Sequence, residues 1–250
     1  MPGPSKRLRI FAGPNGSGKS TVINQIKGRY NCGPYINADD IQQSLDKYAH
    51  IDLYRNYGLR FVQEDFDKYL QSTGLSWEAK AAEQKIKVNL FPDGFSLKVK
   101  GLSGAYDAAI AADFIRRQLL QKEQTFTFET VFSHPSKIGF MSEARALGFK
   151  NYLYFVCTVA PEINISRVAN RVAAGGHDVP QDKIISRYEA SLKLLPGIIP
   201  LIHRGFFFDN SSEEGAQLVG EINTAGDFKT TSAYMPWWLE KYVVEPLYRP

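Results

Sequence analysis

Apolar runs alternate with helical patterns along most of the chain. Five β-like runs lie at 8–12, 35–37, 125–128, 152–157 and 205–208. Apolar residues recur at helical spacing at 21–26, 38–48, 105–119 and 135–147. Short strands separated by helices are typical of a parallel sheet covered on both faces. We therefore predict an α/β fold in which a parallel five-stranded sheet is flanked by helices.

The stretch from 46 to 104 interrupts this alternation. Apolar and polar residues alternate over 86–90 and again over 95–99, and Pro-Asp-Gly at 92–94 supplies turn chemistry between them. We predict a β-hairpin in an inserted module, 46–104, within a single domain that spans 1–250. One face of the hairpin carries lysines that would either meet an acidic substrate or form a solvated face, namely Lys85, Lys87, Lys98 and Lys100.

Two helical patterns, 161–174 and 180–195, are separated by Gly175-Gly176. Paired glycines permit a hinge, so we predict a helical lid over 161–195. Beyond the run at 205–208 we expect a helix near 213–220 and a C-terminal piece, 236–239, that docks on the body.

The segment GPNGSGKS, Gly13 to Ser20, follows the first strand and opens the first helix. In this context, G-x-x-x-x-G-K-S is the phosphate-loop pattern: successive backbone N–H groups and the helix N-terminus face an anion. We predict a nucleoside triphosphate site in which Lys19 reaches the terminal phosphates and the Ser20 hydroxyl holds Mg²⁺. The predicted nucleotide-binding residues are Gly13, Pro14, Asn15, Gly16, Ser17, Gly18, Lys19, Ser20 and Thr21.

The amino-acid composition is that of a soluble globular protein. The chain has 250 residues, 44% of them hydrophobic and 22% charged, with a net charge of +4. These values describe an ordinary soluble protein, and the mild positive charge favours an anionic ligand without requiring nucleic acid. The two cysteines, Cys32 and Cys157, lie in or beside apolar segments, which predicts reduced thiols rather than a disulfide framework. With no bilayer-length apolar run and no signal-peptide pattern, we expect a cytoplasmic protein without a membrane partner.

Two carboxylates follow the second strand. Asp39 and Asp40 lie where parallel α/β sheets bind ligands, at the carboxyl edge. Asp39 suits a base that accepts a proton from an acceptor hydroxyl, and helix capping is its alternative role. Asp40 competes for the first role, although first-turn helix charge explains it more simply.

Three arginines lie in the predicted lid. Arg167 and Arg171 are four residues apart and share a helix face, and Arg187 lies in the second helix. Arginines that close over the phosphates would neutralise the transferred group, with Arg171 as our first choice. Their alternative is a solvated helix face.

A further polar pair, Glu129-Thr130, ends the third strand. We expect it to orient the acceptor or to hold a magnesium-bound water; capping of the next loop is the alternative. The turn Asp209-Asn210-Ser211 after the last strand either contacts the nucleotide base or simply forms a turn.

Together the motifs GPNGSGKST, INADDI, TFTFETVFS, FFFDNS and RVANRVAAGGHDVPQDKIISRYEASL resemble the zeta-toxin-like kinases of the P-loop superfamily. The similarity is greatest to the chromosomal branch described as predicted ATPases or kinases. It covers most of the chain except about 46–104 and the last thirty or so residues. The block containing GGHDVP is its most specific part.

This resemblance implies a P-loop kinase acting on UDP-N-acetylglucosamine, with a protein antitoxin as the partner of toxic members. By the resemblance, Lys19 and Ser20 match the nucleotide and magnesium positions, and Asp39 matches the aspartate that deprotonates the sugar hydroxyl. Glu129 and Thr130 match a substrate-side pair. Arg171 matches a phosphate-clamping arginine, and we assign Arg167 to the second.

The resulting hypothesis is a P-loop kinase that uses ATP or GTP with Mg²⁺ to phosphorylate a hydroxyl of a small anionic acceptor. Two other functions stay open: a nucleotide-dependent binding or regulatory ATPase module, and a nucleic-acid end kinase that uses the lysines of the hairpin.

Overall fold

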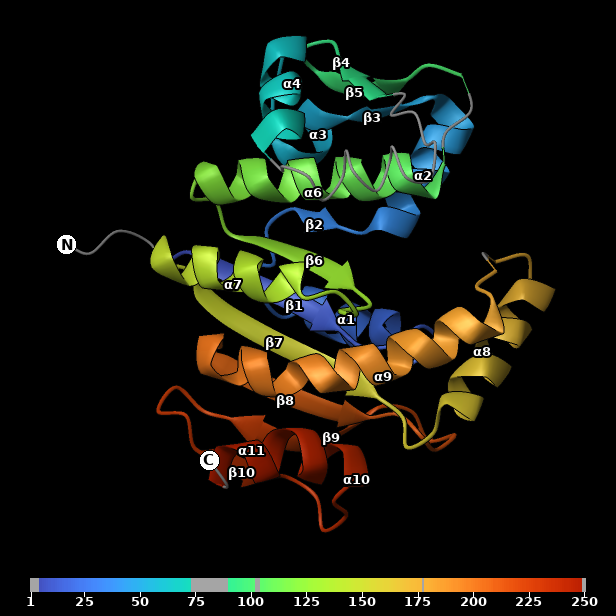
Figure 1. Ribbon diagram of the computed structural model, residues 1–250, viewed down its shortest axis with the longest axis vertical. Coiled ribbons are helices and arrows are strands. Elements are labelled where there is room, and N and C mark those ends of the chain that lie inside the picture. The colour runs from blue at the N-terminus through green and yellow to red at the C-terminus, as the bar shows by residue number, and fades with distance from the viewer. Residues whose placement is uncertain (1–4, 73–89, 102–103, 177, 249–250) are drawn as a thin grey trace. The chain divides into compact units, whose positions relative to one another are not determined.

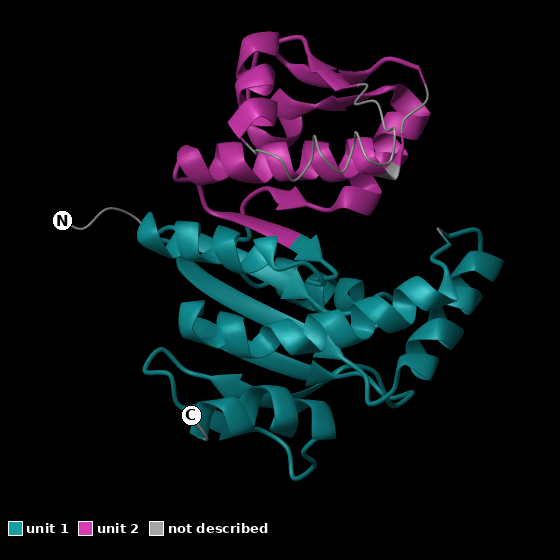
Figure 2. Ribbon diagram, viewed as in Figure 1, with its two compact units in different colours: residues 1–32, 129–250 teal, residues 33–128 magenta. Residues whose placement is uncertain are grey.

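The computed structural model describes residues 5–72, 90–101, 104–176 and 178–248. The chain forms two compact units, which Figure 2 distinguishes by colour. Unit 1 consists of 1–32 and 129–250, and unit 2 consists of 33–128. The predicted insertion, 46–104, therefore belongs to a unit that is longer at both ends.

The sheet of unit 1 is parallel where it carries the phosphate loop. Its strands follow the order β10-β9-β8-β7-β1. These are β1 (Arg7–Ala12), β7 (Lys150–Cys157), β8 (Arg204–Asp209), β9 (Gln217–Ile222) and β10 (Phe228–Thr230). β7 pairs in parallel with both β1 and β8, whereas β9 and β10 are antiparallel additions at the edge. The carboxyl ends of β1, β7 and β8 therefore meet at one edge.

Aromatic side chains fix the register of these three strands. Phe11 is paired with Tyr154, and Tyr154 with Phe206. The Phe11 and Tyr154 rings stack with centroids 4.5 Å apart, and the Tyr154 and Phe206 rings with centroids 5.0 Å apart. A slip by one residue would move each ring to the other face, so this ladder stabilises one register.

Helices cover the sheet of unit 1. They are α1 (Lys19–Lys27), α7 (Ser136–Ala146), α8 (Pro161–Ala173), α9 (Gln181–Ile198) and the C-terminal turns α10 (Trp237–Leu239), η2 (Glu240–Val244) and α11 (Glu245–Tyr248). A 3₁₀ turn, η1 (Ile199–Leu201), continues α9. Figure 1 shows α7 and α9 crossing the same face of the sheet. Helix α1 ends at Lys27, and Gly28 is its C-cap.

Unit 2 combines helices with a small antiparallel sheet. Its strands β3 (His50–Asp52), β5 (Ser96–Val99) and β4 (Leu90–Pro92) lie in that order. Its helices are α2 (Ala38–Tyr48), α3 (Leu53–Tyr57), α4 (Gln63–Ser72) and α6 (Ala105–Gln121). A short strand, β2 (Tyr35–Ile36), pairs in parallel with β6 (Phe126–Thr130), whose last two residues belong to unit 1.

The core of unit 2 is aromatic. Phe114 of α6 makes edge contacts with Phe61 and Phe66, at centroid distances of 5.0 and 5.1 Å. The Tyr69 hydroxyl donates to the Asp113 carboxylate at 3.1 Å, so this buried polar group has a hydrogen-bond partner. These contacts attach α4 to α6.

The α/β prediction is confirmed, but the strand number is wrong. The large sheet has seven strands rather than five: β9 and β10 add to the five predicted strands. The helix expected near 213–220 does not form: Gly215 has a φ of 94°, which ends any helix that starts at Glu213. Beyond it, Val219 and Ile222 are buried in β9.

Other elements are close to their predicted places. The hairpin is confirmed over 90–99, while 86–89 and two of its lysines, Lys85 and Lys87, lie outside the described residues. The remaining lysines point to a structural role, since Lys98 pairs with Asp93 and Lys100 lies over the Phe91 ring. β3, α3 and α4 had not been predicted within 46–104.

Both cysteines are free and buried, as predicted. Burial raises the pKa of the Cys157 thiol far above its usual range, so this side chain stays neutral.

The C-terminal piece docks through Trp238. Its side chain is fully buried, and the indole N–H donates to Asp209 Oδ2 at 2.9 Å. We expect Trp238→Phe to lower the free energy of unfolding by about 1–3 kcal/mol, because the buried carboxylate loses a donor. Urea unfolding measures the difference. The control is Trp237→Phe, because Trp237 is 44% exposed and donates to a backbone carbonyl. Equal losses in the two variants would contradict the assignment.

Candidate active site

The phosphate loop, residues 13–18, joins the end of β1 to the start of α1. Glycine is required at both of its ends. Gly13 has a φ of 142°, and a Cβ there would lie 2.0 Å from the carbonyl oxygen of Val156. Gly18 has a φ of 93°, and its Cβ would lie 2.1 Å from Asn210 Nδ2. Any larger residue would push the loop away from β7 or from the residues after β8.

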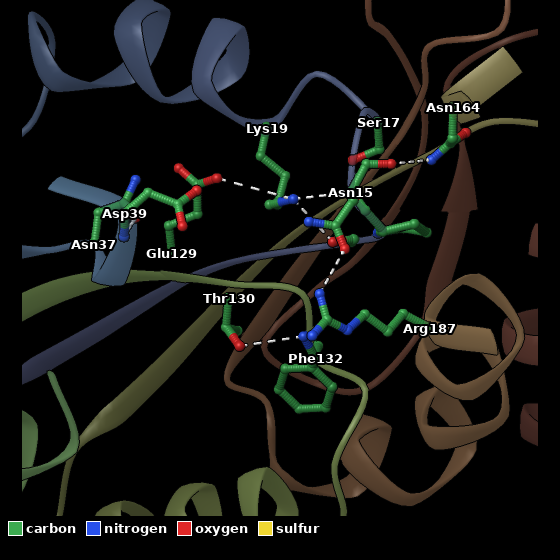
Figure 3. Close-up of polar contacts among 12 residues, drawn as sticks. Asn15, Ser17, Lys19, Asn37, Asp39, Glu129, Thr130, Phe132, Asn164 and Arg187 are labelled. Atoms are coloured by element: carbon green, nitrogen blue, oxygen red, sulfur yellow. Dashed lines mark hydrogen bonds and ion pairs between the residues drawn. The ribbon is translucent and has the colours of Figure 1, made fainter. Parts of the chain in front are cut away.

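Lys19 lies inside the curve of the loop. Its side chain is only 7% exposed, and Nζ donates to the carbonyl oxygens of Gly13 and Pro14, each at 2.9 Å. Glu129 Oε1 lies 3.8 Å from the same nitrogen (Figure 3). The ammonium is therefore held at the mouth of the loop by two carbonyls and one carboxylate, all of unit 1.

Two asparagines outside the loop hold its backbone. Asn164 of α8 donates from Nδ2 to the carbonyl oxygen of Asn15 at 2.6 Å. Asn210, directly after β8, donates from Nδ2 to the carbonyl oxygen of Ser17 at 2.8 Å. Because these hydrogen bonds hold the carbonyl groups of Asn15 and Ser17, the backbone amides of the loop keep a fixed direction. These two asparagines thus pre-organise the loop.

Ser17 contributes a further polar group. Its Oγ is buried and has no hydrogen-bond partner among the residues that the structure describes. A hydroxyl in a loop of this shape suits an anionic ligand, which would accept its hydrogen bond.

The predicted lid consists of α8 and α9, which are packed by an apolar cluster of Val168, Val179 and Ile184. Gly175 has a φ of 86°, and Gly176 N–H donates to the Arg171 carbonyl at 2.9 Å. The glycines thus end α8, and their use as a hinge stays a prediction.

Lid arginines reach the site in different ways. Arg187 of α9 donates from Nη1 to Asn15 Oδ1 at 3.4 Å, so this side chain lies at the loop (Figure 3). Arg167 donates to the carbonyl oxygens of Asn210 and Ser212, at 2.6 and 3.3 Å. Arg171 is exposed on the last turn of α8. Arg167 therefore supports the asparagine that holds the loop.

Glu129 and Thr130 end β6, as predicted. The Thr130 hydroxyl accepts from the backbone N–H of Phe132 at 3.1 Å. Phe132 is buried with a φ of 59°, a left-handed conformation that this bond helps to stabilise. Thr130 thus has a local structural role, whereas Glu129 faces Lys19.

Asp39 lies in unit 2, in the first turn of α2. It is exposed, and Asn37 Oδ1 accepts from its backbone N–H at 2.9 Å. Asn37 is therefore the helix cap, and capping does not account for the Asp39 carboxylate. Asp39 belongs to unit 2 and the phosphate loop to unit 1, so the expectation that the Asp39 carboxylate lies close to the loop stays a prediction.

The two asparagines that hold the loop had no predicted role in the site. Asn210 had been noted only as part of a turn after the last strand. Asn164 lies within a predicted helix, where nothing in its spacing distinguishes it from other polar helix residues.

Neither a metal-binding cluster nor a membrane-spanning helix occurs among the described residues. The residues that the structure describes contain no group of three His, Cys, Asp or Glu side chains able to hold a metal ion. Histidine is a common metal ligand and catalyst, but the imidazole of His134 forms a hydrogen bond with the Ser136 hydroxyl. His177 lies outside the described residues. No helix within the described ranges is long and apolar enough to cross a membrane.

Comparisons with known proteins show the fold. No protein-family model matches the chain, and no curated protein matches it by sequence. A structure of AvrRxo1-ORF1:AvrRxo1-ORF2 with sulphate ions superposes with a TM-score of 0.55 at 14% identity over 92% of this chain. A second structure of that complex, with ATP, has a TM-score of 0.55 at 16% identity over 92% of this chain. This chain spans 62% and 61% of the matched chains in the two structures.

A structure from the PezAT chromosomal toxin-antitoxin system of Streptococcus pneumoniae has a TM-score of 0.50 at 14% identity. It covers 97% of this chain, and 80% of that chain is covered.

We expect Gly18→Ala to weaken ATP binding at least about tenfold, because its Cβ would collide with Asn210 and left-handed strain would be added. Titration with a fluorescent ATP analogue measures the affinity. Gly226→Ala is the matched control, since its φ is 92° but nothing lies within 4 Å of its Cβ. The control should lose stability without losing affinity. Unchanged affinity in Gly18→Ala would refute the role of this contact.

The motifs resemble those of zeta-toxin-like P-loop kinases, and these structures confirm the fold that this resemblance implies.

Proposed function

We propose that this chain is a P-loop kinase that transfers the terminal phosphoryl group of ATP or GTP to a hydroxyl of a small anionic acceptor. The observation that carries the proposal is the loop 13–18, closed around Lys19 and held by Asn164 and Asn210. The ATP complex of a structural neighbour supports it, because that protein shares the fold. A loop of this shape binds phosphates through backbone N–H groups.

The residues present fit a nucleotide with its metal. The Ser17 hydroxyl and the loop amides would bind phosphate oxygens, and the exposed Ser20 hydroxyl would hold Mg²⁺. When bound, Mg²⁺ neutralises charge on the phosphates. Lys19 would exchange its loop carbonyls for phosphate oxygens while Glu129 stays beside it.

Asp39 is our proposed base. During transfer, a bond forms between the acceptor oxygen and the terminal phosphorus while the bond to the leaving nucleotide oxygen breaks. The proton of the acceptor hydroxyl passes to the Asp39 carboxylate. Correct placement matters more than basicity here, because the transition state is loose and the proton leaves late.

The lid arginines have separate proposed roles. Arg171 would contact the transferred phosphoryl group, and Arg187 would act from α9 beside Asn15. Arg167 acts indirectly: it bonds to the Asn210 carbonyl, and the Asn210 side chain bonds to the loop. Arg167 is thus proposed as a positioning residue, in place of the clamping role suggested by the sequence.

UDP-N-acetylglucosamine is the acceptor implied by the resemblance and the first to test. A protein antitoxin is the corresponding proposed partner, supported by the fold shared with a toxin-antitoxin system. The deciding experiment incubates the protein with γ-labelled ATP and a panel of UDP-sugars, small metabolites and short oligonucleotides. Label on a small molecule supports the proposal. Label on an oligonucleotide supports the end kinase, and bound nucleotide without transfer supports the regulatory module.

Substitutions separate binding from transfer. We expect Lys19→Ala to abolish productive ATP binding, and Asp39→Asn to keep the nucleotide affinity but lose transfer, because the amide accepts no proton. Asp46→Asn is the control, since Asp46 is an exposed aspartate of the same helix. Nucleotide affinity and label transfer are both measured. Full transfer by Asp39→Asn would remove Asp39 from the mechanism.

The arginines give a second test. Arg171→Ala should lower kcat by roughly 10³-fold, the usual effect of an arginine that stabilises the transferred group. Arg167→Ala should instead lower the ATP affinity by about tenfold, because a charge-assisted bond that supports the loop is lost. Steady-state kinetics and direct nucleotide titration distinguish the two effects. A purely kcat defect in Arg167→Ala would contradict the positioning role.

A further inference from the structure

A pocket of about 440 Å³ lies within unit 2. One wall comes from β2 and the start of α2, and the other comes from β3 and α3. The volume is within the roughly 300–1,000 Å³ that small-molecule sites occupy. The second wall belongs to 46–104, the segment that the motifs of the family resemblance do not cover.

Polar groups gather in this pocket. Asn37, Asp40 and Ser44 line it from the first wall, and Arg55, Asn56 and Tyr57 line it from the second. The apolar part is Ile41 and Ile51, each 2% exposed. A pocket of this composition suits a compact ligand with several hydroxyls rather than a lipid or an aromatic compound.

Several of these residues are held in place. The Asn37 amide donates to the Tyr35 hydroxyl at 3.3 Å and accepts from Asp39 N–H. The backbone N–H of Arg55 donates to Asp52 Oδ1 at 2.7 Å, which caps α3 and fixes the position from which Arg55 projects. Burial and the nearby Asp40 carboxylate raise the pKa of Tyr57 to about 12, so its hydroxyl remains a donor.

The charges of the pocket are of opposite sign. Arg55 is exposed, and no salt bridge joins its guanidinium to the residues described for this chain. A planar guanidinium binds a phosphate with two parallel hydrogen bonds. A carboxylate such as Asp40 only accepts hydrogen bonds, so it selects ligand hydroxyls.

From these observations we infer that the pocket binds the phosphoryl acceptor, a hydroxylated small molecule bearing a phosphate group, with Arg55 on the phosphate and Asp40 on a hydroxyl. The inference rests on the proposed kinase function and adds the acceptor site to it. Asp39, the proposed base, directly precedes the pocket residue Asp40 in the first turn of α2. The segment 46–104 would thus determine acceptor specificity.

Calorimetric titration tests the assignment. The probes are ribose 5-phosphate, N-acetylglucosamine 1-phosphate and UDP-N-acetylglucosamine, with ribose, N-acetylglucosamine and inorganic phosphate for comparison. The full chain is first saturated with a non-hydrolysable ATP analogue, so that the phosphate loop does not compete for the probes. At least one phosphorylated sugar should bind about tenfold more tightly than its unphosphorylated form and than inorganic phosphate.

Arg55→Gln should lose about tenfold in affinity for that compound. Arg60→Gln is the matched control: Arg60 belongs to the same module, but its guanidinium lies over the Tyr54 and Phe95 rings, 4.4 and 4.6 Å from their centroids. Asp40→Asn should also weaken binding, whereas Asp46→Asn should not. Thermal unfolding confirms that each variant is folded.

Three outcomes would overturn the inference. They are no binding of any phosphorylated sugar, equal binding of the unphosphorylated sugars, and equal losses in Arg55→Gln and Arg60→Gln. Transfer of label from ATP to another compound would leave the kinase proposal standing even then. Failure of the ATP analogue to bind would refute the kinase proposal itself.

Discussion

A phosphate-binding loop has to keep its backbone amides pointing inward before any ligand arrives. In this chain the shape is imposed from outside the loop. The Val156 carbonyl lies against Gly13, while Asn164 and Asn210 occupy the carbonyls of Asn15 and Ser17. These contacts come from β7, α8 and the residues after β8. The parallel sheet serves the loop by bringing these points to one edge.

The same constraint explains where the charges lie. Lys19 is nearly buried, which is tolerable only because two carbonyls and Glu129 surround its ammonium group. A lysine held in this way loses little side-chain freedom when it binds, since its position is already set. The loop and its lysine therefore form one pre-organised group.

Much of this arrangement could be predicted from the sequence because its signals are local. Glycine spacing, an apolar strand and a following helix identify the loop, and β-like runs locate β1, β6, β7 and β8. The bracing by Asn164 and Asn210 is not local, as it joins residues far apart in the chain. The first part of β9 was predicted as helix. The turn before it depends on the left-handed conformation of Gly215, which the pattern of polar and apolar residues does not reveal. In unit 2, α4 is short, and the aromatic core around Phe114 stabilises it through tertiary packing rather than intrinsic propensity.

The docking of Trp238 has a consequence for how this protein is handled. Its indole bonds to Asp209, the residue next to the asparagine that holds Ser17. The last helical turns are therefore only two side chains away from the loop backbone. A shortened expression clone that ends before Pro236, or a fusion that strains these turns, would disturb a region remote in sequence, and the resulting inactive preparation could be mistaken for a catalytically incompetent protein.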